Sequence, residues 1–205
     1  MIETEAQARE YCATLVSDAQ LAALARFVEM LVAENERQNL VSDATLALAW
    51  QRHIADSLQL IEYVPRETSV WLDLGTGAGF PGMAVAIALS ERPVVLVESR
   101  KRRVEWLESV IAELGLTQCR VIGSKLEDVE SMPAGVISAR AFAPLDKLLR
   151  LSARFSTRES IWLLPKGRKA AQELQEQPAN IRAMFHVEQS KTDLQAGILV
   201  GKGAP

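Results

Sequence analysis

A glycine-rich segment preceded by a carboxylate is the part of this sequence whose residue types and spacing could bind a ligand. Asp73 lies near the end of an apolar run, and glycines follow at positions 75, 77, 79 and 82. Glycine lets the backbone approach a ligand without a Cβ in the way. The loop joins the apolar run, residues 70–74, to a small-residue run, residues 83–89. This order predicts the strand, loop and helix of a nucleotide-binding unit.

The loop is compatible with two cofactors. Its last three glycines, Gly77-x-Gly79-x-x-Gly82, satisfy the dinucleotide fingerprint. Its first three, Gly75-x-Gly77-x-Gly79, with Asp73 two residues ahead, instead resemble the first motif of S-adenosylmethionine-dependent methyltransferases. Asp73 favours the second interpretation, because a carboxylate repels a pyrophosphate and attracts the sulfonium and ammonium groups of S-adenosylmethionine. A turn without a ligand is the third interpretation, and it is weakened because glycines beside a buried strand reduce packing.

Acidic residues after the next two predicted strands indicate a nucleoside. Glu98 lies 16 residues after Gly82 and 23 after Gly75. A carboxylate near this spacing accepts hydrogen bonds from a ribose diol, which both cofactors carry. Glu127 and Asp128 follow the third predicted strand. An acidic residue there often contacts the adenine amino group in methyltransferases, and we interpret Asp128 as a surface residue.

The elements that must position these residues alternate between strand and helix from Val70 onwards. Apolar runs predict strands at residues 70–74, 94–98, 119–122, 136–139 and 161–164, and helices at 82–90, 101–114, 145–155 and 168–177. Two late apolar runs, 184–187 and 198–200, have no helix between them and predict a closing antiparallel hairpin. The pattern predicts an α/β fold with a mostly parallel, seven-stranded Rossmann-like sheet whose last strand is antiparallel.

Two helices precede this alternating part. Residues 17–38 predict an amphipathic helix that opens with a capping box at Ser17 and Gln20, and residues 45–63 predict a second helix that ends before Pro65. Neither belongs to a strand–helix–strand repeat. We therefore predict that residues 1–65 form a helical cap within the same domain as residues 66–205.

The composition is that of an ordinary globular protein. The chain has 205 residues, 48% of them hydrophobic and 24% charged, and a net charge of −3. Cys12 and Cys119 show no zinc spacing, and no metal is expected. Neither a secretory signal nor an apolar run of roughly 20 residues is visible, so the cytoplasm is the expected location.

Basic residues gather where the predicted strands end. Arg140 and Lys166 follow the fourth and fifth strands, at the edge where ligands bind in open α/β sheets. Because the net charge is negative, a polyanionic partner requires such a local basic patch. For a single residue, a solvated helix start explains the charge equally well. Candidates for RNA binding are Arg100, Lys101, Arg102, Arg103, Lys166, Arg168 and Lys169.

Several segments together resemble the RsmG (also called GidB) methyltransferases, which modify guanine in bacterial small-subunit ribosomal RNA. They run through most of the chain in matching order and spacing. The matching segments are residues 39–42, 52–57, 72–82, 136–143 and 165–169.

The resemblance implies a class I methyltransferase fold and transfer of a methyl group from S-adenosylmethionine to a guanine ring nitrogen of 16S ribosomal RNA, giving 7-methylguanosine. It implies cofactor contacts at Gly75, Phe80, Leu126, Glu127 and Arg140. The nitrogen attacked has a free lone pair, so no general base is expected, and Arg140 is the candidate for positioning substrate or cofactor. The full set of predicted cofactor residues is Asp73, Gly75, Gly77, Gly79, Phe80, Glu98, Leu126, Glu127 and Arg140.

Two other functions stay open at this point. An NAD-dependent oxidoreductase is disfavoured by Asp73 and by the lack of a catalytic segment outside the sheet. A non-catalytic RNA- or ribosome-binding protein could retain the same nucleoside pocket. His53, Asp56 and Ser57 contain the residue types of a hydrolytic triad, but their spacing on one helix predicts local pairing. The segment from Arg52 to Ser57 either contacts RNA or seats the cap. We expect a monomer that acts on 16S ribosomal RNA or an assembling small subunit, without membrane contact.

Overall fold

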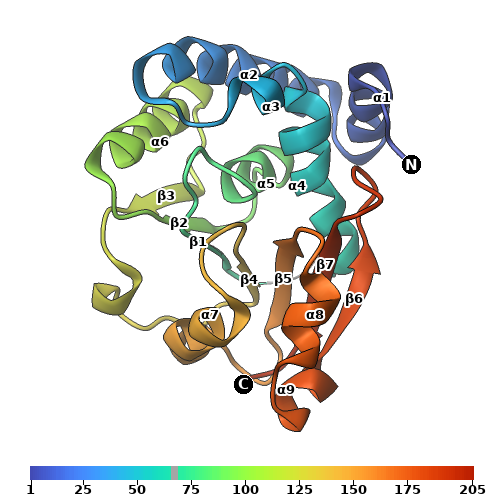
Figure 1. Cartoon of the computed structure of the whole chain (residues 1–205). Helices are drawn as coiled ribbons and strands as arrows, with labels where there is room; N and C mark the ends of the chain where they lie inside the picture. Colours follow the sequence, from blue (N-terminus) through green and yellow to red (C-terminus); the bar gives the residue numbers. More distant parts are fainter. Residues whose placement is uncertain (66–68) are drawn as a thin grey trace.

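A seven-stranded sheet in the order β3-β2-β1-β4-β5-β7-β6 organises the computed structural model, which describes residues 1–65 and 69–205 (Figure 1). β7 runs antiparallel to β5 and β6, and the other pairs are parallel. The predicted sheet and its antiparallel last strand are confirmed. The strands are β1 Trp71–Leu74, β2 Val94–Val97, β3 Cys119–Ile122, β4 Val136–Ser138, β5 Ile161–Lys166, β6 Phe185–Gln189 and β7 Gly197–Lys202.

The central strands are buried on both faces. In β1, Trp71 faces one hydrophobic core, whereas Leu72 and Leu74 face a second core on the other side of the sheet. β2 alternates in the same way, with Val94 in the first core and Val95 in the second. This explains why both strands read in the sequence as continuous apolar runs.

Helices cover both faces of the sheet, as Figure 1 shows. The N-terminal helices pack with α5 and α6 over the first core, which includes Leu24, Phe27 and Ile54 together with residues of the sheet. The cap therefore shares a core with the alternating part. This side carries α1 Glu5–Leu15, α2 Asp18–Gln38, α3 Asp43–Leu46, α4 Asp56–Leu58, α5 Gly82–Ala88 and α6 Lys101–Leu114, and the other side carries α7 Leu145–Ser152, α8 Ala170–Gln175 and α9 Ala179–Met184.

The helix predicted at residues 45–63 is wrong as a continuous element. After α3, the chain forms a π-helix, η1 Trp50–Ala55, then α4, then a 3₁₀ helix, η2 Gln59–Tyr63. Side chains replace the regular backbone pairing here. The Glu5 carboxylate accepts hydrogen bonds from the amides of Trp50 and Gln51, at 3.0 and 2.8 Å. π-Helical turns are frequent at functional sites.

Several other elements differ from the predicted ones in their presence or their bounds. The sequence analysis did not predict α1, which Thr4 caps by accepting a hydrogen bond from the Gln7 amide, or α9. The run at 184–187 predicts a strand from Met184, whereas Met184 ends α9 and β6 begins at Phe185. The helix predicted at 145–155 is α7 followed by a 3₁₀ turn, η4 Ala153–Phe155. A further 3₁₀ turn, η3 Leu126–Asp128, follows β3.

The capping box at Ser17 and Gln20 is confirmed, and the predicted helix at 101–114 matches α6. Cys12 and Cys119 are free and buried, and burial raises the pKa of each thiol to about 12. Among the residues that the structure describes, no helix is long and apolar enough to cross a membrane.

Candidate active site

Asp73 fixes the glycine loop from inside the protein. Its side chain is fully buried, and its two oxygens accept hydrogen bonds from the Ser138 hydroxyl at 2.6 Å and from the Gly82 amide at 3.1 Å. Burial raises the pKa of Asp73, and these hydrogen bonds oppose that shift. The Asp73 carboxylate thus positions the loop against the sheet, and its predicted interaction with a cationic ligand stays a prediction. Gly82 is required at this point, since a Cβ there would lie 2.6 Å from the Asp73 carboxylate and 2.4 Å from Leu96.

Glu98 holds the other side of the loop. Its side chain is nearly buried at the end of β2, and it accepts hydrogen bonds from the amides of Gly77, Ser99 and Arg100 at 2.8–3.0 Å. The guanidinium of Arg103 lies 3.9 Å from the same carboxylate. Glu98 thus joins the glycine loop to the start of α6.

A cavity of about 370 Å³, here named the glycine-loop cavity, opens at the carboxyl ends of β1, β2 and β3. Gly75 and Glu98 line it, as do residues 124–127 after β3 and residues 141–143 after β4. Gly75 has φ of +65°, and a Cβ on it would lie 2.4 Å from the Phe142 ring. Phe142 therefore packs directly on the glycine loop.

A second cavity, of about 580 Å³, lies beside the first and is here named the ion-pair cavity. Residues 141–143 line both cavities and form their shared wall. The remaining lining comes from segments that are distant in sequence. It includes Arg52, His53 and Asp56 from the cap, residues 165–167 at the end of β5, Glu173 on α8, and Asp193 in the β6–β7 hairpin.

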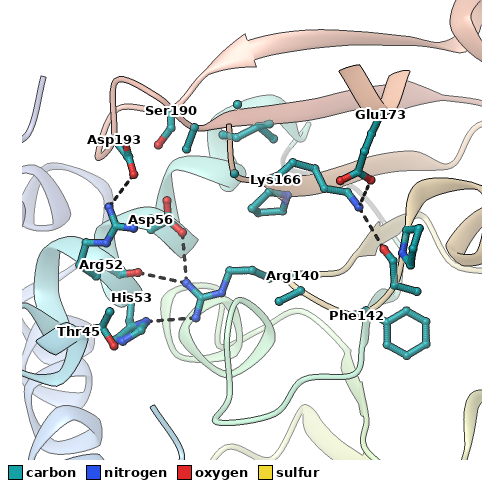
Figure 2. Close-up of a pocket in the computed structure, with 18 residues that line it drawn as sticks. Thr45, Arg52, His53, Asp56, Arg140, Phe142, Lys166, Glu173, Ser190 and Asp193 are labelled. Carbon is teal, nitrogen blue, oxygen red and sulfur yellow. Dashed lines mark hydrogen bonds and ion pairs between the residues drawn. The ribbon is translucent and has the colours of Figure 1, made fainter. Parts of the chain in front are cut away.

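Arg140 lies at the centre of the ion-pair cavity (Figure 2). Its guanidinium donates to the Arg52 carbonyl at 3.1 Å and to the Asp56 carboxylate at 3.2 Å, and it lies 3.2 Å from Nδ1 of His53. It also lies over the Phe80 ring, 5.2 Å from the ring centroid. Contacts on several sides leave Arg140 little freedom to move.

His53 is neutral in this arrangement. Burial, together with the charges of Arg140 and Arg52, lowers the pKa of His53 to about 3. A neutral ring lets Nδ1 accept from Arg140, which assigns the proton to Nε2. Nε2 is buried and has no hydrogen-bond partner among the residues that the structure describes. The ring stacks on Phe80 at 4.8 Å between centroids.

Two more ion pairs flank Arg140 in Figure 2. Arg52 pairs with Asp193 at 3.0 Å, and both side chains are about one-third exposed at the rim. Lys166 pairs with Glu173 at 2.8 Å and also donates to the Ala143 carbonyl at 3.2 Å. Lys166 is the more enclosed of the two cations, with 11% of its side chain exposed against 38% for Arg52.

The predicted cofactor residues do not all share one cavity. Gly75, Glu98, Leu126 and Glu127 line the glycine-loop cavity, whereas Arg140 lines the ion-pair cavity. The remaining predicted residues are not part of either lining. Gly77 and Gly79 belong to the loop behind it, and Asp73 and Phe80 are buried in the interior.

The predicted RNA-binding residues also separate. Arg100 and Arg103 line the glycine-loop cavity, and Lys166 lines the ion-pair cavity. Lys101 projects into solvent, and Arg102 donates to the Arg37 carbonyl at 3.0 Å. Arg168 and Lys169 are exposed between β5 and α8.

The sequence analysis missed three residues that shape the cavities, namely Phe142, Glu173 and Asp193. Phe142 lies in residues 136–143, one of the segments that match the family, so the sequence already indicated that this position after β4 matters. Glu173 lies seven residues after Lys166. That separation does not predict an ion pair unless the path of the chain from β5 into α8 is known. Asp193 approaches Arg52 across 141 residues, and no local pattern indicates that contact. His186 lies exposed on β6 beside Glu188 and lines neither cavity.

Comparison with known proteins identifies close relatives. A family model described as GidB, rRNA small subunit methyltransferase G, matches residues 20–197. A ribosomal RNA small subunit methyltransferase G from Erythrobacter litoralis is 58% identical, and the match covers 99% of this chain and 98% of the relative. A protein of the same name from Novosphingobium aromaticivorans is 57% identical, with 98% of this chain and 88% of the relative covered.

Solved structures show the same fold at low sequence identity. A SAM-dependent methyltransferase from Aquifex aeolicus matches with a TM-score of 0.56 at 15% identity, over 71% of this chain and 88% of that one. A chain of a fibrillarin/Nop5p complex matches with a TM-score of 0.57 at 10% identity, over 75% of this chain and 82% of that one. These similarities concern the fold alone.

Proposed function

The chain belongs to the GidB family of S-adenosylmethionine-dependent rRNA methyltransferases, and from that membership we propose that it methylates N7 of a guanine in bacterial 16S ribosomal RNA. The glycine-loop cavity is the cofactor site in this proposal, and the ion-pair cavity receives the guanine. The observation that carries the proposal is that these two cavities share a wall, residues 141–143. A methyl donor and its acceptor have to meet at such a boundary.

The residues around the glycine-loop cavity fit S-adenosylmethionine. In this proposal Glu98, on the cavity lining, accepts hydrogen bonds from the ribose hydroxyls in addition to those from three backbone amides, and Glu127 accepts from the adenine amino group. The backbone of Gly75, which is also on the lining, contacts the amino-acid part of the cofactor. A volume of about 370 Å³ lies within the range of cofactor sites.

The proposed methyl transfer needs no general acid or base from the protein. When bound, S-adenosylmethionine supplies a methyl group on a positively charged sulfur. Guanine N7 has a free lone pair and no proton, so no general base is needed, and His53 is held neutral beside Arg140. The protein contributes mainly by positioning the base, an effect that supplies roughly 7–11 kcal/mol of barrier reduction in well-oriented reactions. The methylated purine is cationic, and the carboxylates of Asp56 and Glu173 on the lining are available to stabilise that charge.

The surroundings of the cavities suit an RNA substrate. Arg100 and Arg103 border the glycine-loop cavity, Arg52 lies at the rim of the ion-pair cavity, and Lys101 is exposed beside them. Phosphate contacts by such residues position an RNA without reading its sequence. We include in the proposal that the protein works as a monomer in the cytoplasm.

Three measurements test this function. Purified protein should transfer labelled methyl groups from S-adenosylmethionine to small-subunit ribosomal RNA, and should bind S-adenosylmethionine in preference to NAD by calorimetry. Mass spectrometry of ribosomal RNA from cells lacking the protein should show one 7-methylguanosine lost, at a position that purified protein restores. Binding of S-adenosylmethionine with no methyl transfer to RNA or to small subunits would contradict the proposal and favour the non-catalytic binding protein.

A further inference from the structure

Lys166 and Glu173 form a largely enclosed ion pair on the lining of the ion-pair cavity, and this pair still has unused hydrogen-bonding capacity. Glu173 Oε2 accepts from Lys166 and from the Leu145 amide, whereas Glu173 Oε1 accepts nothing from the residues that the structure describes. The ammonium group of Lys166 donates to Glu173 and to the Ala143 carbonyl, which leaves one of its three N–H groups free. The pair therefore offers the cavity one donor and, beside it, one acceptor.

The other two ion pairs of the cavity are less suited to bind a ligand edge. Both oxygens of Asp56 already accept hydrogen bonds, Oδ2 from Arg140, and Oδ1 from the Thr192 hydroxyl at 2.8 Å and the Gln59 side-chain amide at 3.0 Å. Asp193 lies at the exposed rim, where one oxygen already accepts from the Gln195 amide at 2.9 Å. Water competes more effectively for a pair at the rim than for an enclosed one.

We propose that Lys166 and Glu173 select guanine by binding its Watson–Crick edge, with Lys166 donating to O6 and Glu173 Oε1 accepting from N1–H. This assignment rests on the proposed function and names the residues that read the base. Guanine presents an acceptor followed by a donor on that edge. Adenine presents the reverse, an amino group and an unprotonated N1, so it would place donor against donor and acceptor against acceptor.

The order of groups on the protein also gives the base its orientation. The Lys166 ammonium donates both to the Glu173 carboxylate and to the Ala143 carbonyl, and Figure 2 shows Lys166 pointing toward Glu173. On guanine, O6 lies between N1–H and N7. With O6 at Lys166 and N1–H at Glu173, N7 points toward Ala143, which belongs to the wall shared with the glycine-loop cavity. The arrangement that selects guanine therefore also turns N7 toward the methyl donor.

The test uses base analogues that keep or lose the two contacts. The RNA is small-subunit ribosomal RNA joined from pieces by ligation, so that the one position that the wild-type protein methylates carries guanosine, inosine or 2-aminopurine riboside. Inosine keeps O6 and N1–H, whereas 2-aminopurine lacks both and retains N7. The variants are Lys166→Met and Glu173→Gln, and kcat/KM is measured on each RNA.

On guanosine and inosine RNA, each variant should lose about 100-fold in kcat/KM, because a buried partner is left unpaired. On 2-aminopurine RNA the wild-type protein also lacks these contacts. The kcat/KM of each variant should therefore lie within about threefold of the wild-type value, a smaller change than the loss of one buried hydrogen-bond partner causes. Losses of equal size on all three RNAs would overturn the proposal and leave the pair with a structural role. Unchanged activity on guanosine RNA would overturn it as well.

A matched control lies near the start of β5, at the opposite end of the strand from Lys166. Lys202 pairs with Glu159 at 2.7 Å on the surface, beside Ile161 at the start of β5. Lys202→Met and Glu159→Gln remove an ion pair of the same composition and should leave kcat/KM unchanged on all three RNAs. Thermal unfolding and cofactor binding by calorimetry check that each variant is folded. Absence of transfer by the wild-type protein to guanosine RNA would contradict the proposed function itself, a result distinct from equal losses by the variants.

Discussion

The two cavities of this protein are built in different ways although they share a wall. The glycine-loop cavity is held by carboxylates that accept from backbone amides, as Glu98 does from Gly77, Ser99 and Arg100. The ion-pair cavity is held by side chains that bind other side chains, as Arg140 does with Asp56. Backbone bonds near strand ends fix one shape, which suits a cofactor that is the same in every turnover.

In the ion-pair cavity, paired side chains present charges and hydrogen-bonding groups to a ligand that enters it. Their donors and acceptors are exchangeable with those of a ligand, which suits the proposed role of recognising one base and then releasing a cationic product. Under the proposed function, substitutions should therefore act on folding and cofactor binding at the first cavity, and on turnover and base choice at the second.

The largest effect is expected from Gly82→Ala, which tests the backbone-held side. The added Cβ would lie 2.6 Å from the Cβ and the carboxylate of Asp73, both fully buried. Overpacking of this kind should lower the free energy of unfolding by about 3 kcal/mol, measured by urea denaturation. Gly167→Ala is the control, because a Cβ there meets nothing within 4 Å among the described residues. Equal stability of the two variants would show that the loop is not packed as described.

Arg140→Ala tests the side-chain-held cavity. Loss of the central cation should lower kcat by about 100-fold, comparable to removing one preorganised electrostatic group from a site. The dissociation constant for S-adenosylmethionine, measured by calorimetry, should change by less than about threefold, because Arg140 lines the other cavity. Such a change corresponds to less than about 1 kcal/mol of binding free energy.

The control for that variant is Arg26→Ala, which removes an arginine paired with Glu113 on the surface of α2. It should leave both quantities unchanged. A rise of tenfold or more in the dissociation constant of Arg140→Ala would return this residue to the cofactor site, where the family resemblance placed it.

The pH dependence of stability tests whether His53 is buried and neutral in the ion-pair cavity. The pKa of His53 falls from 6.5 to about 3 on folding, so between these values the unfolded chain binds a proton that the folded chain does not. Stability should therefore fall as the pH falls, by roughly 2 kcal/mol from about pH 6.5 to about pH 5.

Denaturation at a series of pH values measures this effect. The variant His53→Asn cannot bind the proton in either state, so its stability should change less over the same interval. A variant with the full wild-type slope would show that the proton is bound elsewhere, and that His53 is not the buried neutral group beside Arg140.

The smallest effect is expected outside both cavities. Lys101 is 89% exposed at the start of α6, and Lys101→Ala should weaken RNA binding only severalfold while reducing the salt slope of binding by about one. Cofactor binding should not change. Filter binding at several salt concentrations measures the slope, with Lys202→Ala as the control. An unaltered slope would remove Lys101 from the RNA-binding surface.

Much of the fold follows from local patterns in the sequence. Alternating apolar runs and helical periodicity predict the sheet, its antiparallel last strand and α6, because burial on both faces of a strand leaves a signal within a few residues. The same reasoning places Gly75, Glu98 and Glu127 at neighbouring strand ends, and the family resemblance adds Leu126; all four line one cavity. The chain order of a parallel sheet brings such ends together without further information.

Local sequence patterns were thus sufficient to predict the sheet, the glycine loop and the sheet edge at which both cavities open. Three features became visible only in the folded chain: Asp73 points inward, residues 50–55 form a π-helix, and Arg52 meets Asp193 and Arg140 meets Asp56 across 141 and 84 residues. These features differ from the predicted ones in the range of the interactions that cause them. Periodicity and turn chemistry act between neighbours in the chain, whereas the burial of a carboxylate and the partner of a charge depend on which distant segments the packed core brings against it.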